Sequence, residues 1–177
     1  MCGIAGSVNY PLPYKKIDAV MQHRGPDGQQ GYTHGNVDLY HLRLSIVDIT
    51  GGTQPMHLED RYTIIFNGEI YNHKELREQF HLKGKTNSDS ETLLLLYQKL
   101  GNNMLQYLEG MFVVVIYDKF EKNLFIARDR AGKKPLYIFN DGSKIVFASE
   151  LNCLKSLLPL EMDKANFFHY TRMGTFY

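Results

Sequence analysis

Apolar residues in the second half of this sequence follow patterns typical of β-strands. Residues 111–117 form one continuous apolar run, Met-Phe-Val-Val-Val-Ile-Tyr, as expected for a strand that is covered on both faces. Two further runs, 136–139 and 144–148, flank a turn sequence, Asn-Asp-Gly-Ser, and predict a hairpin. With the shorter runs of the first half, strands are predicted over 3–9, 37–46, 62–66, 111–117, 123–128, 136–139 and 144–148.

The dipeptide Asn67-Gly68 lies between two short apolar runs, 62–66 and 70–71. In this setting Asn-Gly is the strongest short-range signal for a hairpin turn. We therefore expect a tight turn here. Such a turn can present an amide NH₂ group and a backbone N–H side by side, which is an arrangement suited to stabilising an oxyanion.

Capping signals and helical spacing predict helices between and after the strands. Ser88 and Glu91 form an S-x-x-E capping box before an apolar stripe that ends at Gly101. Asn72 and Glu75 form a similar pair. Helices are predicted over 16–22, 72–80, 88–100, 104–108, 150–157 and 164–170.

This order of elements predicts an α+β layered sandwich. The strands fall into two groups, and several are apolar on both faces, so one sheet is expected to pack on the other while helices cover the outside. The chain has 177 residues, of which 44% are hydrophobic and 22% are charged. These values are typical of one ordinary globular domain with a substantial core.

Composition excludes several classes of function. A formal net charge of +1 argues against a nucleic-acid or membrane surface. The histidines lack metal-ligand spacing, so no metal site is predicted, and neither a P-loop nor a G-x-S-x-G motif occurs. No transmembrane run or signal peptide is found, and Cys2 and Cys153 make no disulfide framework. A reduced, cytoplasmic compartment is therefore expected.

Cys2 directly follows the initiator methionine. If Met1 is removed, one residue carries both a thiol, with an unperturbed pKa of about 8.5, and a free amine, with one of about 8. The amine would then act as general base for the thiol nucleophile. The alternative is that Cys2 is a small buried apolar residue without a catalytic role.

Two charged residues lie at positions that suit a zwitterionic ligand. Arg43 interrupts an apolar strand, so its guanidinium either reaches the surface or binds a carboxylate through two hydrogen bonds. Asp89 starts a helix, where an exposed carboxylate either favours the helix dipole or pairs with a substrate ammonium. Glu69 and Arg24, taken alone, are typical of solvated surface charges. A nucleophile, two oxyanion donors, a cation and an anion together suit an amino acid with a side-chain amide, although spacing alone does not bring them together.

Ordered motifs then connect the chain to a known family. It resembles the N-terminal glutaminase domain of glutamine-hydrolysing asparagine synthetase, a class II glutamine amidotransferase domain with the N-terminal-nucleophile (Ntn) hydrolase fold. The resemblance covers residues 1–157 and rests on Met-Cys-Gly-Ile-Ala-Gly at 1–6, His-Arg-Gly-Pro-Asp at 23–27, Arg-Leu-Ser-Ile-Val-Asp at 43–48, Asn-Gly-Glu-Ile-Tyr-Asn at 67–72, Ser-Asp-Ser-Glu at 88–91, Gly-Met-Phe at 110–112, Arg-Asp-Arg at 128–130, Lys-Pro-Leu-Tyr at 134–137 and Phe-Ala-Ser-Glu at 147–150.

The resemblance implies a four-layer αββα sandwich and a role for each site residue. Cys2 would attack the glutamine amide and form a thioester, with its own amine as base. The Asn67 side chain and the Gly68 N–H would form the oxyanion hole. Substrate binding would involve Arg43 at the α-carboxylate, Asp89 at the α-ammonium with help from Glu69, and the backbone of Leu44, Ile46 and Val47.

The resemblance also implies what this domain works with. Residues 1–157 would be the amidotransferase domain, and 158–177 a terminal helix and the start of a truncated linker to an absent ATP-pyrophosphatase synthetase domain. That domain would use ATP and Mg²⁺, whereas this one needs no cofactor, and a homodimer is compatible with the family. Two alternatives stay open: a glutamine-binding regulatory module that is inactive without its partner, and the amidotransferase half of an enzyme that amidates another carboxylate.

Overall fold

The computed structural model describes residues 1–45 and 51–174. Within this part the strands and helices come in groups along the chain. The strands are β1 (Gly3–Val8), β2 (Gly28–His34), β3 (Val37–Arg43), β4 (Met56–Leu58), β5 (Tyr62–Ile70), β6 (Gly110–Asp118), β7 (Asn123–Arg128), β8 (Tyr137–Asn140) and β9 (Ile145–Ala148). The α-helices are α1 (Tyr14–Met21), α2 (His73–Gln79), α3 (Asp89–Leu100), α4 (Leu151–Leu157) and α5 (Lys164–Met173), and the 3₁₀ helices are η1 (Gln22–Arg24) and η2 (Gly101–Gln106).

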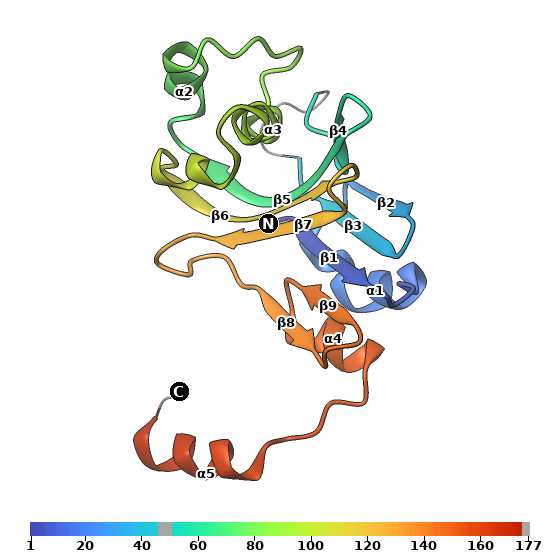
Figure 1. Ribbon diagram of the computed structural model, residues 1–177. Coiled ribbons are helices and arrows are strands. Elements are labelled where there is room, and N and C mark those ends of the chain that lie inside the picture. The colour runs from blue at the N-terminus through green and yellow to red at the C-terminus, as the bar shows by residue number, and fades with distance from the viewer. Residues whose placement is uncertain (46–50, 175–177) are drawn as a thin grey trace.

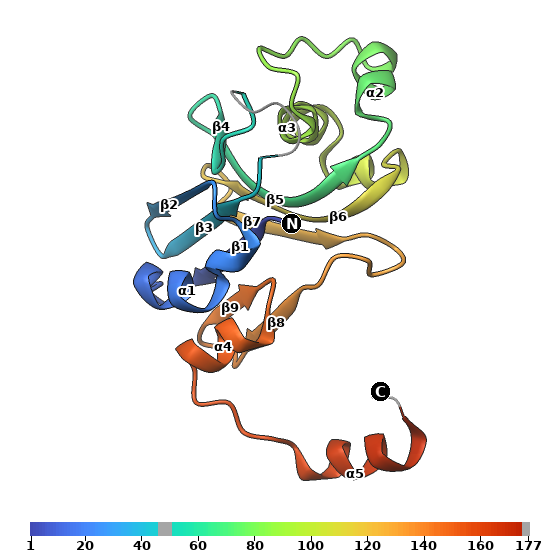
Figure 2. The same cartoon turned by 180° about the vertical axis from the view of Figure 1, so that it is seen from behind.

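The described strands form two antiparallel sheets. One has five strands in the order β2-β3-β1-β9-β8, and the other has four in the order β4-β5-β6-β7. The sheets pack on each other, with α1 and α4 outside the first and α2 and α3 outside the second (Figures 1 and 2). The predicted α+β sandwich of four layers, αββα, is therefore confirmed.

The layer between the sheets is apolar because the inward-facing positions of both sheets carry large side chains. Ile4 of β1, Leu39 of β3 and Phe147 of β9 meet Ile65 of β5 and Val115 of β6, and all five are fully buried. Side chains alternate between the two faces of a strand. Cys2 and Arg43 therefore share the inner face with Ile4 and Leu39, and Asn67 shares it with Ile65.

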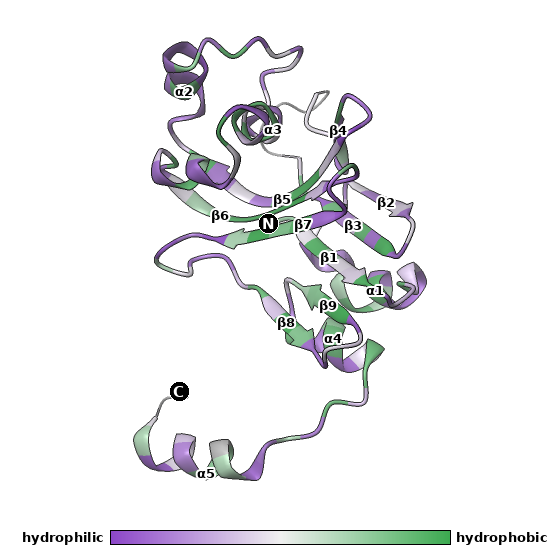
Figure 3. Ribbon diagram, viewed as in Figure 1, coloured by the Kyte–Doolittle hydropathy of each residue, from purple (hydrophilic) through white to green (hydrophobic). Residues whose placement is uncertain are grey.

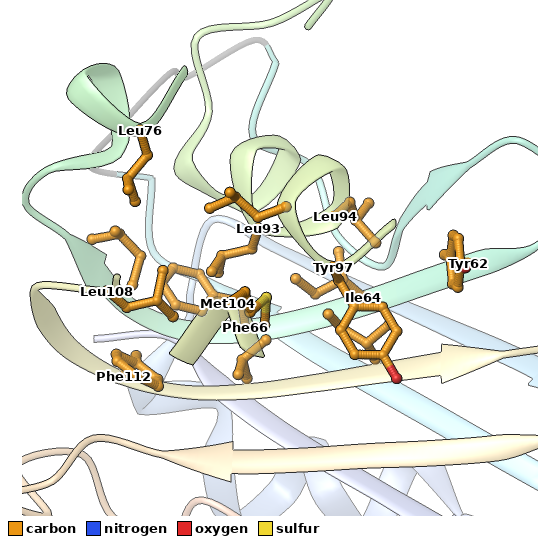
Figure 4. Close-up of a cluster of buried hydrophobic side chains, with 14 residues drawn as sticks. Tyr62, Ile64, Phe66, Leu76, Leu93, Leu94, Tyr97, Met104, Leu108 and Phe112 are labelled. Carbon is orange, nitrogen blue, oxygen red and sulfur yellow. The ribbon is translucent and has the colours of Figure 1, made fainter. Parts of the chain in front are cut away.

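Each sheet also packs on its own helices through its other face. Figure 4 shows the larger of these clusters, in which Leu93 and Tyr97 of α3 pack over Ile64 and Phe66 of β5. On the opposite side of the molecule, Ile17 of α1 and Leu154 of α4 belong to the cluster under β1 and β3. Figure 3 colours the ribbon by hydropathy, and the strand β6 is mostly apolar in it. This agrees with the burial of β6 on both faces.

The terminal helix α5 lies away from the sheets in both views (Figures 1 and 2). Its large apolar side chains are exposed: Phe167, Phe168, Tyr170 and Met173. The helix predicted over 164–170 therefore exists, and the division of the chain at residue 157 stays a prediction. None of the helices in the described ranges is long and apolar enough to cross a lipid bilayer.

The hairpin predicted at Asn67-Gly68 is wrong. Both residues lie inside β5, opposite Val113 and Phe112 of β6, so the strand continues to Ile70. The run after Gly68 is too short to form a second hairpin strand, whereas β6 offers a long apolar partner. Glycine is needed here for space, because a Cβ on Gly68 would lie 2.2 Å from the Met111 carbonyl oxygen.

Of the two predicted side-chain caps at helix N-termini, one forms and the other does not. Ser88 caps α3, and its side chain accepts a hydrogen bond from the backbone nitrogen of Ser90 at 3.1 Å. Asn72 precedes α2 but makes no side-chain cap. Instead its amide ties the start of α2 to the segment between η2 and β6, donating to the Tyr107 carbonyl and accepting from Glu109 N–H. The strands β2 and β4 were missed, since β2 carries no apolar alternation and β4 has only three residues.

Candidate active site

A cavity of about 130 Å³ opens between the ends of the two sheets. Its walls come from segments far apart in the sequence, which the sandwich brings together. Most of the predicted site residues line it: Cys2, Arg43, Leu44, Asn67, Gly68, Glu69 and Asp89. The remaining two, Ile46 and Val47, lie outside the described residues.

The Cys2 thiol is held by the chain that leaves β3. Its Sγ accepts a hydrogen bond from Leu44 N–H at 3.4 Å and lies 3.5 Å from the Leu44 carbonyl oxygen. Gly3 and Leu42 are the last paired residues of β1 and β3 at this end of the sheet, so Cys2 and Leu44 meet just beyond the paired region. Cys2 is only half-buried. The alternative of a thiol enclosed in the core therefore does not hold.

Residues of η1 and of the turn between η1 and β2 hold the two backbone segments next to the thiol, one at Cys2 and one at the end of β3. Arg24 donates from Nε to the Cys2 carbonyl at 3.2 Å and from Nη1 to Glu150 at 3.1 Å. Asp27 accepts from Ser45 N–H at 2.7 Å, and its own N–H donates to the Arg43 carbonyl at 3.0 Å. Arg24 is thus a structural clamp in an ion pair and not a solvated surface charge.

Arg43 is the last residue of β3 and brings a guanidinium to the cavity. One of its nitrogens, Nη1, lies 3.5 Å from the hydroxyl of Thr53. The side chain is half-buried. A cation in this position suits a ligand carboxylate.

The Asn67 side chain is almost completely buried, with 1% of its surface exposed. Within the described residues its Nδ2 has no hydrogen-bond partner. Burying an amide N–H without an acceptor costs about 1–3 kcal/mol. This donor lines the same cavity as the Cys2 thiol, so it can donate a hydrogen bond to an acceptor atom of a ligand that enters the cavity.

The Gly68 N–H points to the same open edge of β5. The N–H groups of alternate residues in a strand point to the same side. On this side Phe66 N–H donates to the Gln54 side chain at 2.6 Å, and Ile70 N–H donates to Asp89 at 3.2 Å. Gly68 lies between them, where β4 no longer pairs with β5. Its N–H therefore faces the cavity and not β6.

Asp89 is buried and not exposed, which corrects the sequence-based expectation. Only 7% of its surface is accessible, because α3 packs against β5. Burial raises the pKa of its carboxyl group, although hydrogen bonds from Ile70 N–H and nearby backbone groups and the charge of His73 oppose this effect. A buried carboxylate with a raised pKa favours a cationic partner. Glu69, by contrast, is exposed at the rim of the cavity.

Sequence reasoning missed three polar residues of the cavity. Gln54 connects β5 to α3 through its hydrogen bond to Ser90 at 3.0 Å. His41 is 1% exposed, and burial lowers its pKa to about 4, so its ring is neutral. Lys134 is 4% exposed and lines the cavity beside Cys2. Its motif was noted, but no periodicity or spacing points to a role for a single lysine in a loop.

A family model described as a glutamine amidotransferase domain matches residues 1–176. This chain belongs to that family. Two curated relatives of this glutamine amidotransferase domain are glutamine-hydrolysing asparagine synthetases. Asparagine synthetase 1 of Bacillus subtilis (strain 168) is 41% identical, with 92% of this chain and 27% of the relative covered. Asparagine synthetase B of Escherichia coli (strain K12) is 38% identical, with 82% of this chain and 26% of the relative covered. The chain thus spans about a quarter of these proteins.

A solved structure supports the fold of the amidotransferase domain. The glutamine phosphoribosylpyrophosphate amidotransferase from B. subtilis, complexed with ADP and GMP, superimposes with a TM-score of 0.71. The two share 22% identity, and the match covers 88% of this chain and 43% of the other. At this identity the likeness concerns the fold, which is of the Ntn-hydrolase type.

Proposed function

We propose that this domain, once Met1 is removed, hydrolyses the side-chain amide of L-glutamine to glutamate and ammonia. The observation that carries the proposal is the buried Asn67 amide, whose Nδ2 lacks a partner in the described chain and which lines one cavity with the Cys2 thiol. A thiol nucleophile and a buried donor in one small cavity suit attack on an acyl group.

The first half of the reaction forms a thioester. The Cys2 amine takes the thiol proton, and the sulfur attacks the amide carbon of glutamine. Asn67 Nδ2 and Gly68 N–H donate to the oxyanion that develops. The amine then gives its proton to the leaving nitrogen, the C–N bond breaks, and ammonia departs.

The second half releases glutamate. The Cys2 amine takes a proton from water, the resulting hydroxide attacks the thioester carbon, and the same two donors stabilise the second oxyanion. The C–S bond breaks, and the proton returns to sulfur. Arg43 binds the substrate α-carboxylate and Asp89 the α-ammonium, with Glu69 contributing negative charge at the rim. The backbone of Leu44, Ile46 and Val47 completes the binding site.

We further propose that the ammonia serves an ATP-dependent synthetase domain beyond this chain, which makes asparagine and binds ATP and Mg²⁺. The names of the curated relatives and their additional length support this assignment. The domain itself is proposed to use no cofactor, to work in the cytoplasm, and to allow a homodimer. Because the acceptor would bind to the proposed synthetase domain, a related acceptor carboxylate in place of aspartate is the main alternative.

The direct test measures glutamate release from glutamine by Met1-free protein, with Cys2→Ala beside it and Cys153→Ala as the matched control. We expect turnover with the wild-type and Cys153→Ala chains and none with Cys2→Ala. Equal activity in Cys2→Ala would exclude the mechanism. Glutamine binding without turnover in the wild-type chain would instead support a binding module that needs its partner domain.

A second version of this test keeps the thiol and blocks the amine. A chain with an extra residue ahead of Cys2 carries an amide nitrogen there, which cannot act as a base. We expect this chain to bind glutamine and to hydrolyse it at least 100-fold more slowly, since general base catalysis contributes about 10²–10⁴.

A further inference from the structure

Lys134 is a buried cation that the proposed mechanism leaves without a role. It lies on the loop between β7 and β8, and this loop is held in place by Asp129, whose carboxylate accepts from the N–H groups of Phe112, Lys133 and Lys134. Arg128 donates to the Lys134 carbonyl from the other side. The position of this lysine is therefore fixed by the fold.

The ammonium of Lys134 reaches the part of the cavity where the N-terminus of the chain lies. Its Nζ lies 2.9 Å from the Sδ of Met1, and both residues line the cavity together with Cys2. A thioether is a weak acceptor, so this contact compensates a buried ammonium poorly. Removal of Met1 takes the thioether away and exposes the Cys2 amine in the same cavity.

The charges around this position are mixed. Burial lowers the pKa of Lys134, and the nearby Arg24 acts in the same direction, whereas Cys2, Glu69 and Asp129 favour the charged form. Among the described residues, the charged and titratable side chains that line the cavity with Cys2 are His41 and Arg43 of β3, Glu69 of β5, Asp89 of α3 and Lys134 of the β7–β8 loop. Outside the lining, Arg24 of η1 contacts the Cys2 carbonyl and pairs with Glu150.

We propose that Lys134 is a positioning residue whose ammonium keeps the amine of mature Cys2 in its neutral, proton-accepting form. This inference rests on the proposed function. Two ammonium groups in one small cavity repel each other, so one of them loses its proton first. An ordinary lysine has a pKa about 2.5 units above that of an α-amine. Burial lowers the pKa of Lys134, but Cys2, Glu69 and Asp129 favour its charged form, so the α-amine is taken as the group that loses the proton. Lys134 thus acts through the Cys2 amine and not on the substrate.

The experiment titrates the amine directly. Met1-free protein is prepared with ¹⁵N-labelled cysteine, and the α-nitrogen shift of Cys2 is followed by NMR from about pH 5 to 10, the range around an α-amine. Cys153 does not interfere, because burial raises the pKa of its thiol to about 12. The variants are Lys134→Met, Lys134→Gln and Lys134→Arg, and the matched control is Lys133→Met, which removes the same charge from an exposed position of the same loop.

We expect the Cys2 amine to titrate about one pH unit higher in Lys134→Met and Lys134→Gln. It should be unchanged in Lys134→Arg and Lys133→Met. The acid limb of kcat/KM for glutamine hydrolysis should shift by the same amount. An unchanged or lower amine pKa in a folded Lys134→Met or Lys134→Gln chain overturns the inference. If the wild-type chain hydrolyses no glutamine, the proposed function fails, and the titration still decides the role of Lys134.

Discussion

The Cys2 sulfur lies 3.4 Å from the backbone nitrogen of Leu44, which is 42 positions away in the sequence. Leu44 directly follows Arg43, so this contact sets the distance between the nucleophile and the cation at the end of β3. The same contact keeps the thiol at the wall of the cavity, on the side opposite to β5. In the proposed mechanism, substrate orientation and nucleophile position thus depend on one pairing between β1 and β3.

Replacing Asn67 by alanine should slow catalysis more than it weakens binding. Loss of one oxyanion donor typically lowers kcat by about 10²–10³. We expect this loss in steady-state glutamine hydrolysis, with KM changed only a few fold. Asn123→Ala, at an exposed position of β7, serves as the control and should behave as wild type. A tenfold rise in KM with normal kcat would show that Asn67 binds substrate and does not stabilise the oxyanion.

Glutamine affinity should fall as the pH falls through the raised pKa of Asp89. The carboxyl must be ionised to bind an ammonium, and burial makes it protonate at a higher pH than an ordinary aspartate. KM measured from about pH 4 to 8 should begin to rise, toward the acid side, at a pH above the ordinary aspartate pKa of about 3.9. A KM that stays constant down to the ordinary pKa would exclude Asp89 as the ammonium site.

The same residue should lower the stability of the fold. Because the folded-state pKa of Asp89 is raised, its ionised form destabilises the folded protein above that pKa, and this effect vanishes below the unfolded pKa. We expect Asp89→Asn to raise the melting temperature at neutral pH while it abolishes glutamine binding. The exposed Asp60 supplies the control, since Asp60→Asn should change neither quantity. A lower melting temperature in Asp89→Asn at neutral pH would contradict this account.

Alanine at Gly68 should destabilise the protein. The new Cβ would lie 2.2 Å from the Met111 carbonyl oxygen and 2.7 Å from Phe112 Cα, and both are backbone atoms that cannot rotate away. The expected cost in urea unfolding is about 1–3 kcal/mol. Gly28→Ala is the matched control, because the nearest atom to its Cβ is 3.9 Å away. Equal effects of the two substitutions would mean that β5 and β6 separate easily at this point.

Native alkylation should distinguish the two cysteines. Cys153 is completely buried, and this burial, with a smaller contribution from Glu150, raises the pKa of its thiol to about 12. Iodoacetamide at neutral pH should therefore label the half-buried Cys2 and leave Cys153 unmodified until the chain unfolds. Peptide mass spectrometry measures both sites, and comparable labelling of the two in the native protein would show that the helix α4 opens readily.

Much of the fold follows from local pattern. The continuous run 111–117 predicted β6, residues 123–128 predicted β7 with its bounds, and Ser88 predicted the start of α3. Two of the errors, at Asn67-Gly68 and at Asp89, share a cause, which is competition from distant segments. Asn67-Gly68 favours a turn in isolation, yet the chain stays extended because β6 pairs along the whole of β5. Asp89 suits an exposed helix start, yet packing of α3 on β5 buries it.

The sequence by itself determined which chemical groups the candidate site contains and which family the chain belongs to, because residue types and the order of motifs can be read without a structure. Cys2 behind Met1, with Arg43, Asn67 and Asp89 in ordered motifs, already predicted a site for glutamine. Only the tertiary structure decided how these groups meet. The two sheets bring the ends of β1, β3 and β5 to one cavity, bury Asp89, aim the Gly68 N–H at an open edge, and place Lys134 beside Cys2. Distances between segments far apart in the chain depend on packing between layers, which no local pattern encodes.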